Sequence, residues 1–518
     1  MSHTPAGPAS GTPAEGRGGH SRRNFLALTT AGAAAAGSAL LMPGQAGAVP
    51  RGPRGSGAAQ VTFSSESTAA GFEPKSGTWY DDPAAGLAAV AHRLSPQDDI
   101  AFVPAGDDSG QVINVDPATT YQSVLGIGTS MEDSTVYALS LMNAGIRTKA
   151  LRALFDPAAG AGFNLTRICF GTSDFSQPAF YTYDDGAADP DLANFSIQKD
   201  IDNQIIATLK EALEINPDLV VFGTTWSAPV WMKDNNSLIG GHLLDEYVPV
   251  FAKYYRMTVE AYAEQGITIH AVTPQNEPLN AASNYPSMLI SAEQEGRLLD
   301  AMHAEFAEAG LSTEIWGYDH NFGQAEDYAA GLYGTPGAYT DAYSHSTAIA
   351  LHDYSGDPSA MSRLKSDYPD LDVIMTERMV WGTEGADRIA QYLRNWSIGY
   401  VAWATMLDQN RQSQQFGKPD PTPLIQSLAD RNTYWELPEY NFFAQYAKFV
   451  QRGAQRVDSD YGSADTVTNV AFLNPDGTVA TVVINQTDAD QDFTLRSEGR
   501  QITATLPAKT TGTYVWQR

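Results

Sequence analysis

Short apolar runs recur along the middle of the chain, and stretches with helical periodicity, such as residues 202–215 and 248–265, separate them. The runs are apolar at successive positions, which is typical of parallel strands buried on both faces. Eight such runs, each followed by a helical stretch, predict a (β/α)8 TIM barrel over residues 119–448. The runs are residues 123–128, 164–171, 219–226, 267–274, 313–320, 346–354, 372–378 and 400–407.

Both flanks of the predicted barrel have the pattern of short strands and turns. Residues 468–485 read as a hairpin closed by the turn Asn474–Gly477. The C-terminal region, 449–518, is too short to cover its own faces as a complete sandwich. We therefore expect the strands of residues 61–118 to join it in one appended antiparallel β-sandwich.

The N-terminus has the layout of an export signal rather than of a folded element. Arg22-Arg23 precede a mild apolar run that ends at Ala46-Gly47-Ala48, as in a twin-arginine signal peptide over residues 1–48. The apolar run is too short for a membrane anchor, and residues 49–60 are a Gly/Pro/Ala-rich linker. We expect a secreted or extracytoplasmic protein without an integral membrane segment; the alternative is a disordered tail.

Charge and composition exclude some classes of binding partner and cofactor. The 32 Lys and Arg residues face 60 Asp and Glu residues, a formal charge of −28, which argues against nucleic acid and anionic membranes. The single cysteine, Cys169, excludes an intrachain disulfide and lies in an apolar run, so we expect a core residue. The nine histidines show no metal-ligand spacing, so we expect no metal and no cofactor.

The candidate chemistry lies where the predicted strands end, because a barrel carries its active site at the C-terminal ends of its strands. Two runs end in glutamates, Glu277 and Glu377, and others end in a carboxylate or in rings. Two carboxylates flanking a glycosidic bond suffice to cleave it. Each residue alone also has a structural interpretation: Asp174 as a helix cap, Trp226 as core. The further residues of this set are Asp174, Trp226, Asn276, His352 and Tyr354.

At these positions the sequence resembles glycoside hydrolase family 30. The resemblance is carried by Asn276-Glu277-Pro278, by "IMTERMVWG" around Glu377, by "RICFGTSDFS", "TTWSAPVWMK" and "ALHDY", and by "GIGTSMEDS" near the start of the barrel. It implies that Glu277 is the acid/base and Glu377 the nucleophile of a retaining mechanism. It also implies substrate contacts from the residues Arg167, Asp174, Trp226, Asn276, His352 and Tyr354.

One segment departs from the family pattern. Glucosylceramidases carry a second tryptophan and an asparagine after the eighth strand, where this chain has Met406 and Leu407. We therefore expect an altered pocket wall, with Trp403 in a structural role. The polar and aromatic residues that follow offer replacements for the wall, namely Gln409, Trp435 and Glu436.

The resemblance implies a β-glycosidase whose partner is a carbohydrate, a β-glucan or β-glucoside, as for a β-1,6-glucanase or a glucosylceramidase. Alternatives within the family are a β-xylanase, a β-galactanase and a β-fucosidase. The alternative from another class is a non-catalytic barrel that binds glycans, which the presence of both glutamates disfavours. For a retaining pair we expect the carboxyl groups of Glu277 and Glu377 to lie about 5–5.5 Å apart.

Overall fold

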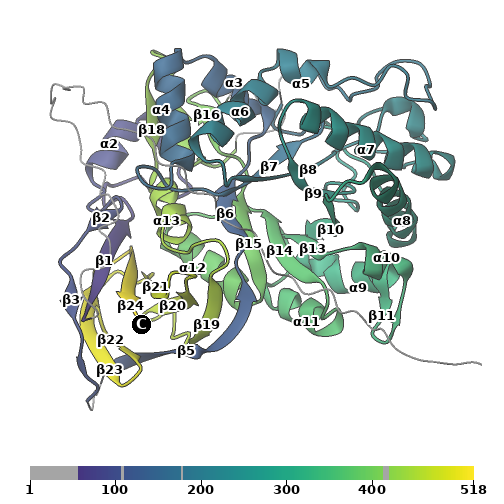
Figure 1. Cartoon of the computed structure of the whole chain (residues 1–518). Coiled ribbons are helices and arrows are strands. Elements are labelled where there is room, and N and C mark those ends of the chain that lie inside the picture. The colour runs from purple at the N-terminus through teal and green to yellow at the C-terminus, as the bar shows by residue number, and fades with distance from the viewer. Residues whose placement is uncertain (1–56, 107–109, 177–178, 412–418) are drawn as a thin grey trace, which may run out of the picture. The chain divides into compact units, whose positions relative to one another are not determined.

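A computed structural model describes residues 57–106, 110–176, 179–411 and 419–518 (Figure 1). The expected signal peptide and most of the expected linker lie outside these ranges. No helix within them is both long enough and apolar enough to cross a membrane.

Eight parallel strands close into a barrel, and each of them overlaps one of the eight predicted runs; the eighth strand begins three residues before its run and ends at Ala402. The barrel interior is filled by large apolar side chains, among them Leu165, Phe222 and Trp316. Gly128 is required where the first two strands meet, because a Cβ there would lie 1.7 Å from the carbonyl oxygen of Leu165. The strands are β6 (Gly126–Thr129), β7 (Leu165–Cys169), β8 (Val220–Thr224), β9 (Ile269–Thr273), β10 (Glu314–Asn321), β13 (Ala348–His352), β14 (Asp372–Glu377) and β15 (Ser397–Ala402).

Helices follow the strands and bury their apolar faces against the barrel. The longest of them, α8, begins at Ser291, whose side chain accepts a hydrogen bond from the backbone of Gln294, and ends at Gly310 with φ of 68°. The helices are α3 (Asp133–Ser140), α4 (Ala144–Phe155), α5 (Gln198–Asp202), α6 (Ile205–Ile215), α7 (Val248–Glu264), α8 (Ala292–Ala309), α9 (Phe322–Tyr333), α10 (Asp341–His345), α11 (Ser359–Asp367), α12 (Gly382–Arg394) and α13 (Pro438–Ala447).

Eleven further strands form the β-sandwich, and both flanks of the barrel contribute to it. N-terminal β1 pairs antiparallel with the C-terminal strand β24, so the purple and yellow ends of the colour range lie side by side in Figure 1. The predicted fold class is thereby confirmed. The order is β2 (Ser95–Pro96), β1 (Ala58–Ser65), β24 (Thr510–Gln517), β21 (Thr478–Asn485), β20 (Thr468–Leu473), β19 (Gln455–Ser459), β5 (Gln111–Ser123), β22 (Gln491–Ser497), β23 (Arg500–Leu506) and β4 (Val103–Pro104), with β3 (Ile100–Ala101) on β1.

Several details differ from the sequence-based expectation. β5 is long enough to pair antiparallel with β19 and, through its first residues, parallel with β22, so the sandwich is not wholly antiparallel. The N-terminal flank also holds two short helices, α1 (Thr78–Asp81) and α2 (Pro83–Ala88). The eighth barrel strand ends at Ala402, and Met406 belongs to a separate small sheet. That sheet is formed by β16 (Met406–Asp408), β17 (Leu424–Gln426) and β18 (Tyr434–Glu436).

Buried polar contacts tie the sandwich strands to the barrel helices. On α13, the amide nitrogen of Gln445 donates to the Ser64 hydroxyl at 2.7 Å, and its oxygen accepts from the Thr513 hydroxyl at 2.6 Å. Just after β1, Glu66 accepts hydrogen bonds from the backbone N–H and the hydroxyl of Thr383 at the start of α12. These contacts hold the segment between β1 and α1 beside the loop that follows β14.

Candidate active site

A cavity of about 640 Å³ opens at the C-terminal ends of the barrel strands, a size typical of ligand sites. Its lining residues follow strands β7 to β10 and β13 to β15. Six of the eight residues expected to form the site line it: Asp174, Trp226, Asn276, Glu277, Tyr354 and Glu377.

Glu277 is held on the loop after β9 in an uncommon backbone conformation, with φ of 48°. Its backbone N–H donates to the carbonyl of Asp319 at 3.0 Å, which stabilises that conformation. The side chain of Asn280 donates to Oε2 at 2.7 Å, and Nδ1 of His352 lies 3.2 Å from Oε1. Nδ1 of His320 lies 3.6 Å from the same oxygen. The carboxyl group is therefore aimed into the cavity with both of its oxygens engaged.

Glu377 is the last residue of β14, and both of its carboxylate oxygens are also engaged. Oε2 accepts from the guanidinium of Arg167, and Oε1 accepts from the hydroxyl of Tyr354 at 2.8 Å. Tyr354 exposes nearly half of its surface, but its hydroxyl is turned inward onto this carboxylate. These contacts fix the position of the carboxylate in the cavity.

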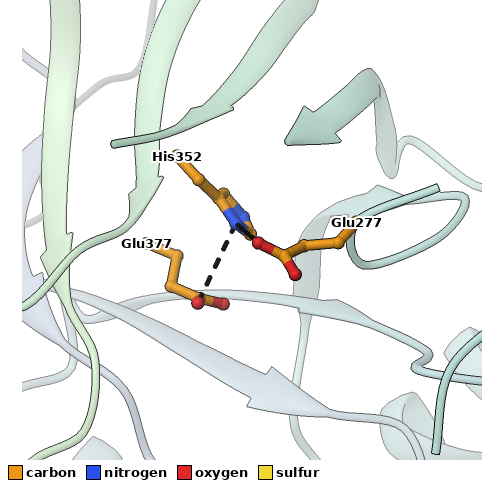
Figure 2. Close-up of side chains that lie close together, drawn as sticks. All are labelled: Glu277, His352 and Glu377. Carbon is orange, nitrogen blue, oxygen red and sulfur yellow. Dashed lines mark hydrogen bonds and ion pairs between the residues drawn. The ribbon is translucent and has the colours of Figure 1, made fainter. Parts of the chain in front are cut away.

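The two glutamates face each other across the cavity, with His352 between them (Figure 2). One oxygen of each glutamate and one ring nitrogen of His352 lie within 4.8 Å of one another. The nearest oxygens of the two carboxylates are therefore no more than 4.8 Å apart, so both groups can reach one bond held in the cavity.

These three groups also have the donor chemistry of a metal site, but their surroundings do not suit a divalent cation. Arg167 already neutralises Glu377, and Nδ1 of His352 is engaged with Glu277. A metal ion would meet a buried guanidinium at short range and would have to displace a proton from the imidazole. We therefore interpret the cluster as an acid–base unit.

The charges around His352 decide where its proton lies. Burial lowers the pKa of this imidazole, but the negative charges of Glu377 and Asp319 outweigh burial and raise that pKa to about 10. For Glu277 the effects are reversed. Burial raises the pKa of this carboxyl group, but hydrogen bonds from His320 and His352 outweigh burial and bring that pKa below its usual range. Both directions place the proton of this pair on His352 rather than on Glu277.

Arg167 and His352 do not line the cavity, which corrects the expectation that they contact the substrate. Both side chains are fully buried behind the glutamates. The guanidinium of Arg167 donates from Nη2 to Asn276 at 2.7 Å and to Asp319 at 2.8 Å, in addition to Glu377. Their function is to position and charge-balance the groups that face the cavity.

Asp319 is the residue that sequence reasoning missed. It accepts from Arg167, from the hydroxyl of Thr273 and from that of Thr376, the latter two at 2.6 Å. Nε2 of His352 lies 3.1 Å from Oδ1 of Asp319. Asp319 stands near the end of the fifth predicted run, so reading that strand end as the others were read would have found it, and the neighbouring His320 with it.

The inner wall of the cavity combines a carboxylate with stacked rings. Oδ1 of Asp174 is buried and has no hydrogen-bond partner among the described residues, so it is available to a ligand hydroxyl. Trp226 stacks on Trp403, with ring centroids 5.2 Å apart, and both line the cavity. Trp403 therefore belongs to the site, and the expectation of a purely structural role was wrong.

The residues expected to rebuild the wall lie elsewhere. Met406 and Leu407 are fully buried in the small sheet, and Gln409, Trp435 and Glu436 are not among the described residues that line the cavity. The wall after β15 is instead formed by Ala404, Pro419, Asp420 and Thr422.

Comparison with known proteins identifies the family. Residues 124–450 match the model of the glycosyl hydrolase family 30 TIM-barrel domain, and residues 453–514 match that of the family 30 β-sandwich domain. The chain is 32% identical to endo-1,6-β-D-glucanase BGN16.3 of Trichoderma harzianum, over 76% of this chain and 84% of that protein. It is 28% identical to putative glucosylceramidase 2 of Caenorhabditis elegans, over 72% and 76%.

A solved structure agrees with these matches. The endo-β1,6-glucanase BT3312 superposes with a TM-score of 0.77 and 26% identity, covering 89% of this chain and 99% of that one. The chain therefore belongs to glycosyl hydrolase family 30 and is an O-glycoside hydrolase.

Proposed function

We propose that this protein is an exported β-1,6-glucanase that cleaves its substrate with retention of configuration. The observation that carries the proposal is the pair of carboxylates, Glu277 and Glu377, facing one cavity at a separation suited to double displacement. The choice of β-1,6-glucan is supported by the similarity to endo-1,6-β-glucanases over most of the length of those proteins. Export is supported by Arg22-Arg23 and the apolar run after them, and cell fractionation tests it.

In the first step, an ionised oxygen of Glu377 attacks the anomeric carbon of the sugar held against Asp174 and Trp226. The bond from that carbon to the leaving oxygen breaks as Glu277 delivers its proton to that oxygen. Arg167 and Tyr354 hold the attacking carboxylate in place. The amide of Asn276, fixed by Arg167, lines the cavity where a sugar hydroxyl accepts or donates a hydrogen bond.

In the second step, Glu277 removes a proton from water, and the resulting oxygen attacks the same carbon. The ester bond to Glu377 breaks and restores the free carboxylate. His352 supports both steps, because it passes its proton to Glu277 before the first step and accepts from Glu277 the proton that is removed from water in the second. Asp319 stabilises the protonated imidazole from the opposite ring nitrogen.

The substrate assignment is tested by incubating the mature protein with linear β-1,6-glucan, β-1,3-glucan, xylan and galactan. We expect β-1,6-glucan to be cleaved at least about tenfold faster than the others, with new reducing ends that are initially β-configured in the NMR spectrum. Initial α-anomers would contradict retention, and preferential cleavage of xylan or galactan would replace the glucanase assignment.

The roles of the two glutamates are tested with dinitrophenyl β-glucoside, whose leaving group needs no proton. Glu277→Ala should accumulate the glycosyl-enzyme, and azide should restore turnover with a β-glycosyl azide as product, because azide needs no general base. Glu377→Gln should be inactive with or without azide. The control Glu384→Ala changes an exposed glutamate on α12 and should behave as wild type. A β-azide from a Glu377 variant alone would reverse the assignment.

The proton shared with His352 predicts a pH effect. In the wild type, the pair loses its last proton at the imidazole, whose pKa is raised to about 10. In His352→Gln the remaining proton sits on the carboxyl of Glu277, so the alkaline limb of kcat/KM should move to lower pH. His345→Gln changes a histidine paired with Asp300 outside the cavity and should leave the limb in place. If the alkaline limb does not move in His352→Gln, the proton used in catalysis does not come from His352.

Asp319 should matter for turnover more than for binding, because it is fully buried and does not line the cavity. Asp319→Asn should lower kcat on the order of 10²-fold, the scale of a general acid–base group, with KM nearly unchanged. Losing a buried ion pair costs roughly 3–5 kcal/mol, so activity is measured well below the melting temperature of the variant. Asp245→Asn, which alters an exposed ion pair with Arg297, is the matched control, and a rise in KM alone would refute this role for Asp319.

A further inference from the structure

The outer part of the cavity differs in chemistry from its inner part. The inner wall is almost wholly buried, whereas the rim carries Lys75, Arg378 and Trp381, which are exposed or half-buried. Arg378 and Trp381 lie between Glu377 and α12, and Lys75 comes from the segment between β1 and α1. The rim therefore joins two segments that are about three hundred residues apart in the chain.

Neither cation on the rim has an ionic partner among the residues that the structure describes. Within the described part of the chain, no hydrogen bond or ion pair engages the ammonium of Lys75 or the guanidinium of Arg378. The ammonium lies 4.6 Å from the centroid of the Trp381 ring, and the guanidinium lies 4.6 Å from that of Tyr354. Two unpaired cations at one cavity are notable in a chain of charge −28.

The rings keep these cations in place without using their hydrogen-bonding capacity. The indole N–H of Trp381 donates to the carbonyl of Pro421 at 2.8 Å, which fixes the ring under Lys75. Tyr354 is fixed in turn by its hydroxyl bond to Glu377. Cation–π contacts hold the charges over the ring faces, so the N–H groups remain free to donate to a ligand.

The roles of the two glutamates indicate which part of the substrate meets the rim. The sugar attacked by Glu377 lies in the inner part, where Asp174 offers a buried oxygen without a partner. The leaving group lies beyond Glu277 and must be able to diffuse away or to continue as a polymer. Only the open side of the cavity allows this.

We propose that Lys75, Arg378 and Trp381 form the subsite for the leaving-group side of the substrate, and that this subsite takes a sugar residue rather than a lipid. The inference rests on the proposed function, and it adds the residues that select the leaving group. Arg and Lys are pure donors, and the hydroxyl and ring oxygens of a sugar are acceptors. An acyl chain would cover both cations without offering acceptors, and burying an unpaired charge is costly.

The test compares the wild type with Lys75→Met, Arg378→Met and the double variant on three substrates. Dinitrophenyl β-glucoside places its one sugar in the inner part of the cavity and brings an aryl ring, without sugar hydroxyls, to the leaving-group side. The dinitrophenyl glycoside of β-1,6-linked glucobiose adds a sugar on the opposite side, and unlabelled β-1,6-linked glucotetraose places sugars on the leaving-group side. Lys210→Met changes an exposed lysine on α6, away from the cavity, and serves as the matched control.

We expect the double variant to lose at least about tenfold more kcat/KM on glucotetraose than on either dinitrophenyl substrate, the scale of one or two charged hydrogen bonds. Its rate on octyl β-glucoside, relative to glucotetraose, should rise. Equal losses on all substrates, or a greater loss on the glucobioside, would overturn the subsite. Because Lys75 is exposed, Lys75→Met should fold and gives the same comparison if the double variant does not.

The experiment distinguishes a failure of the proposed function from a failure of the proposed subsite. If the wild type cleaves xylan or galactan oligosaccharides instead of glucotetraose, the proposed function falls, and the same variant-to-wild-type ratio is measured on the oligosaccharide that is cleaved. A selective loss there would still support the subsite. If the wild type cleaves only the alkyl and aryl glucosides, the subsite proposal falls as well.

Discussion

The guanidinium of Arg167 is the interaction on which the arrangement of the site depends. It is fully buried in the middle of β7 and binds Glu377, Asn276 and Asp319, which come from three other parts of the barrel. Carboxylates brought this close together in a water-poor interior would repel one another and become protonated. A fixed, permanently charged fork between them offsets that repulsion and sets the position of the amide beside it.

Arg167 balances only part of the negative charge, and His352 balances a further part. Counting Glu277, Glu377 and Asp319 as anions, one guanidinium leaves two negative charges, and a protonated His352 leaves one. The proton of His352 is the mobile charge in this set, because it can move to Glu277 over a 3.2 Å contact. The same electrostatic requirement that stabilises the folded site thus supplies the proton that the chemistry needs.

The barrel and the two glutamates were predictable because both follow from local patterns. Apolar runs mark the strands, and residues after parallel strands converge at one end of a barrel, so Glu277 and Glu377 were placed together before any contact was known. Asp319 also stands near a strand end, but its orientation depends on a local irregularity: Tyr318 and Asp319 have φ of 77° and 58°, and the pairing of β10 with β13 shifts register there. Such a bulge re-aims a side chain in a way that alternation cannot predict.

The rim of the cavity illustrates a second kind of information that local patterns lack. Lys75 reaches the mouth of the barrel because β1 pairs with β24 and because Glu66 binds the start of α12 at Thr383. That contact fixes the N-terminal end of the helix that begins directly after Trp381. The sandwich therefore does more than cover one side of the barrel: its first strand sets where a cation stands relative to Glu377. Selection of the leaving group then depends on the contact between the sandwich and the barrel. It can change without a change in the residues that break the glycosidic bond.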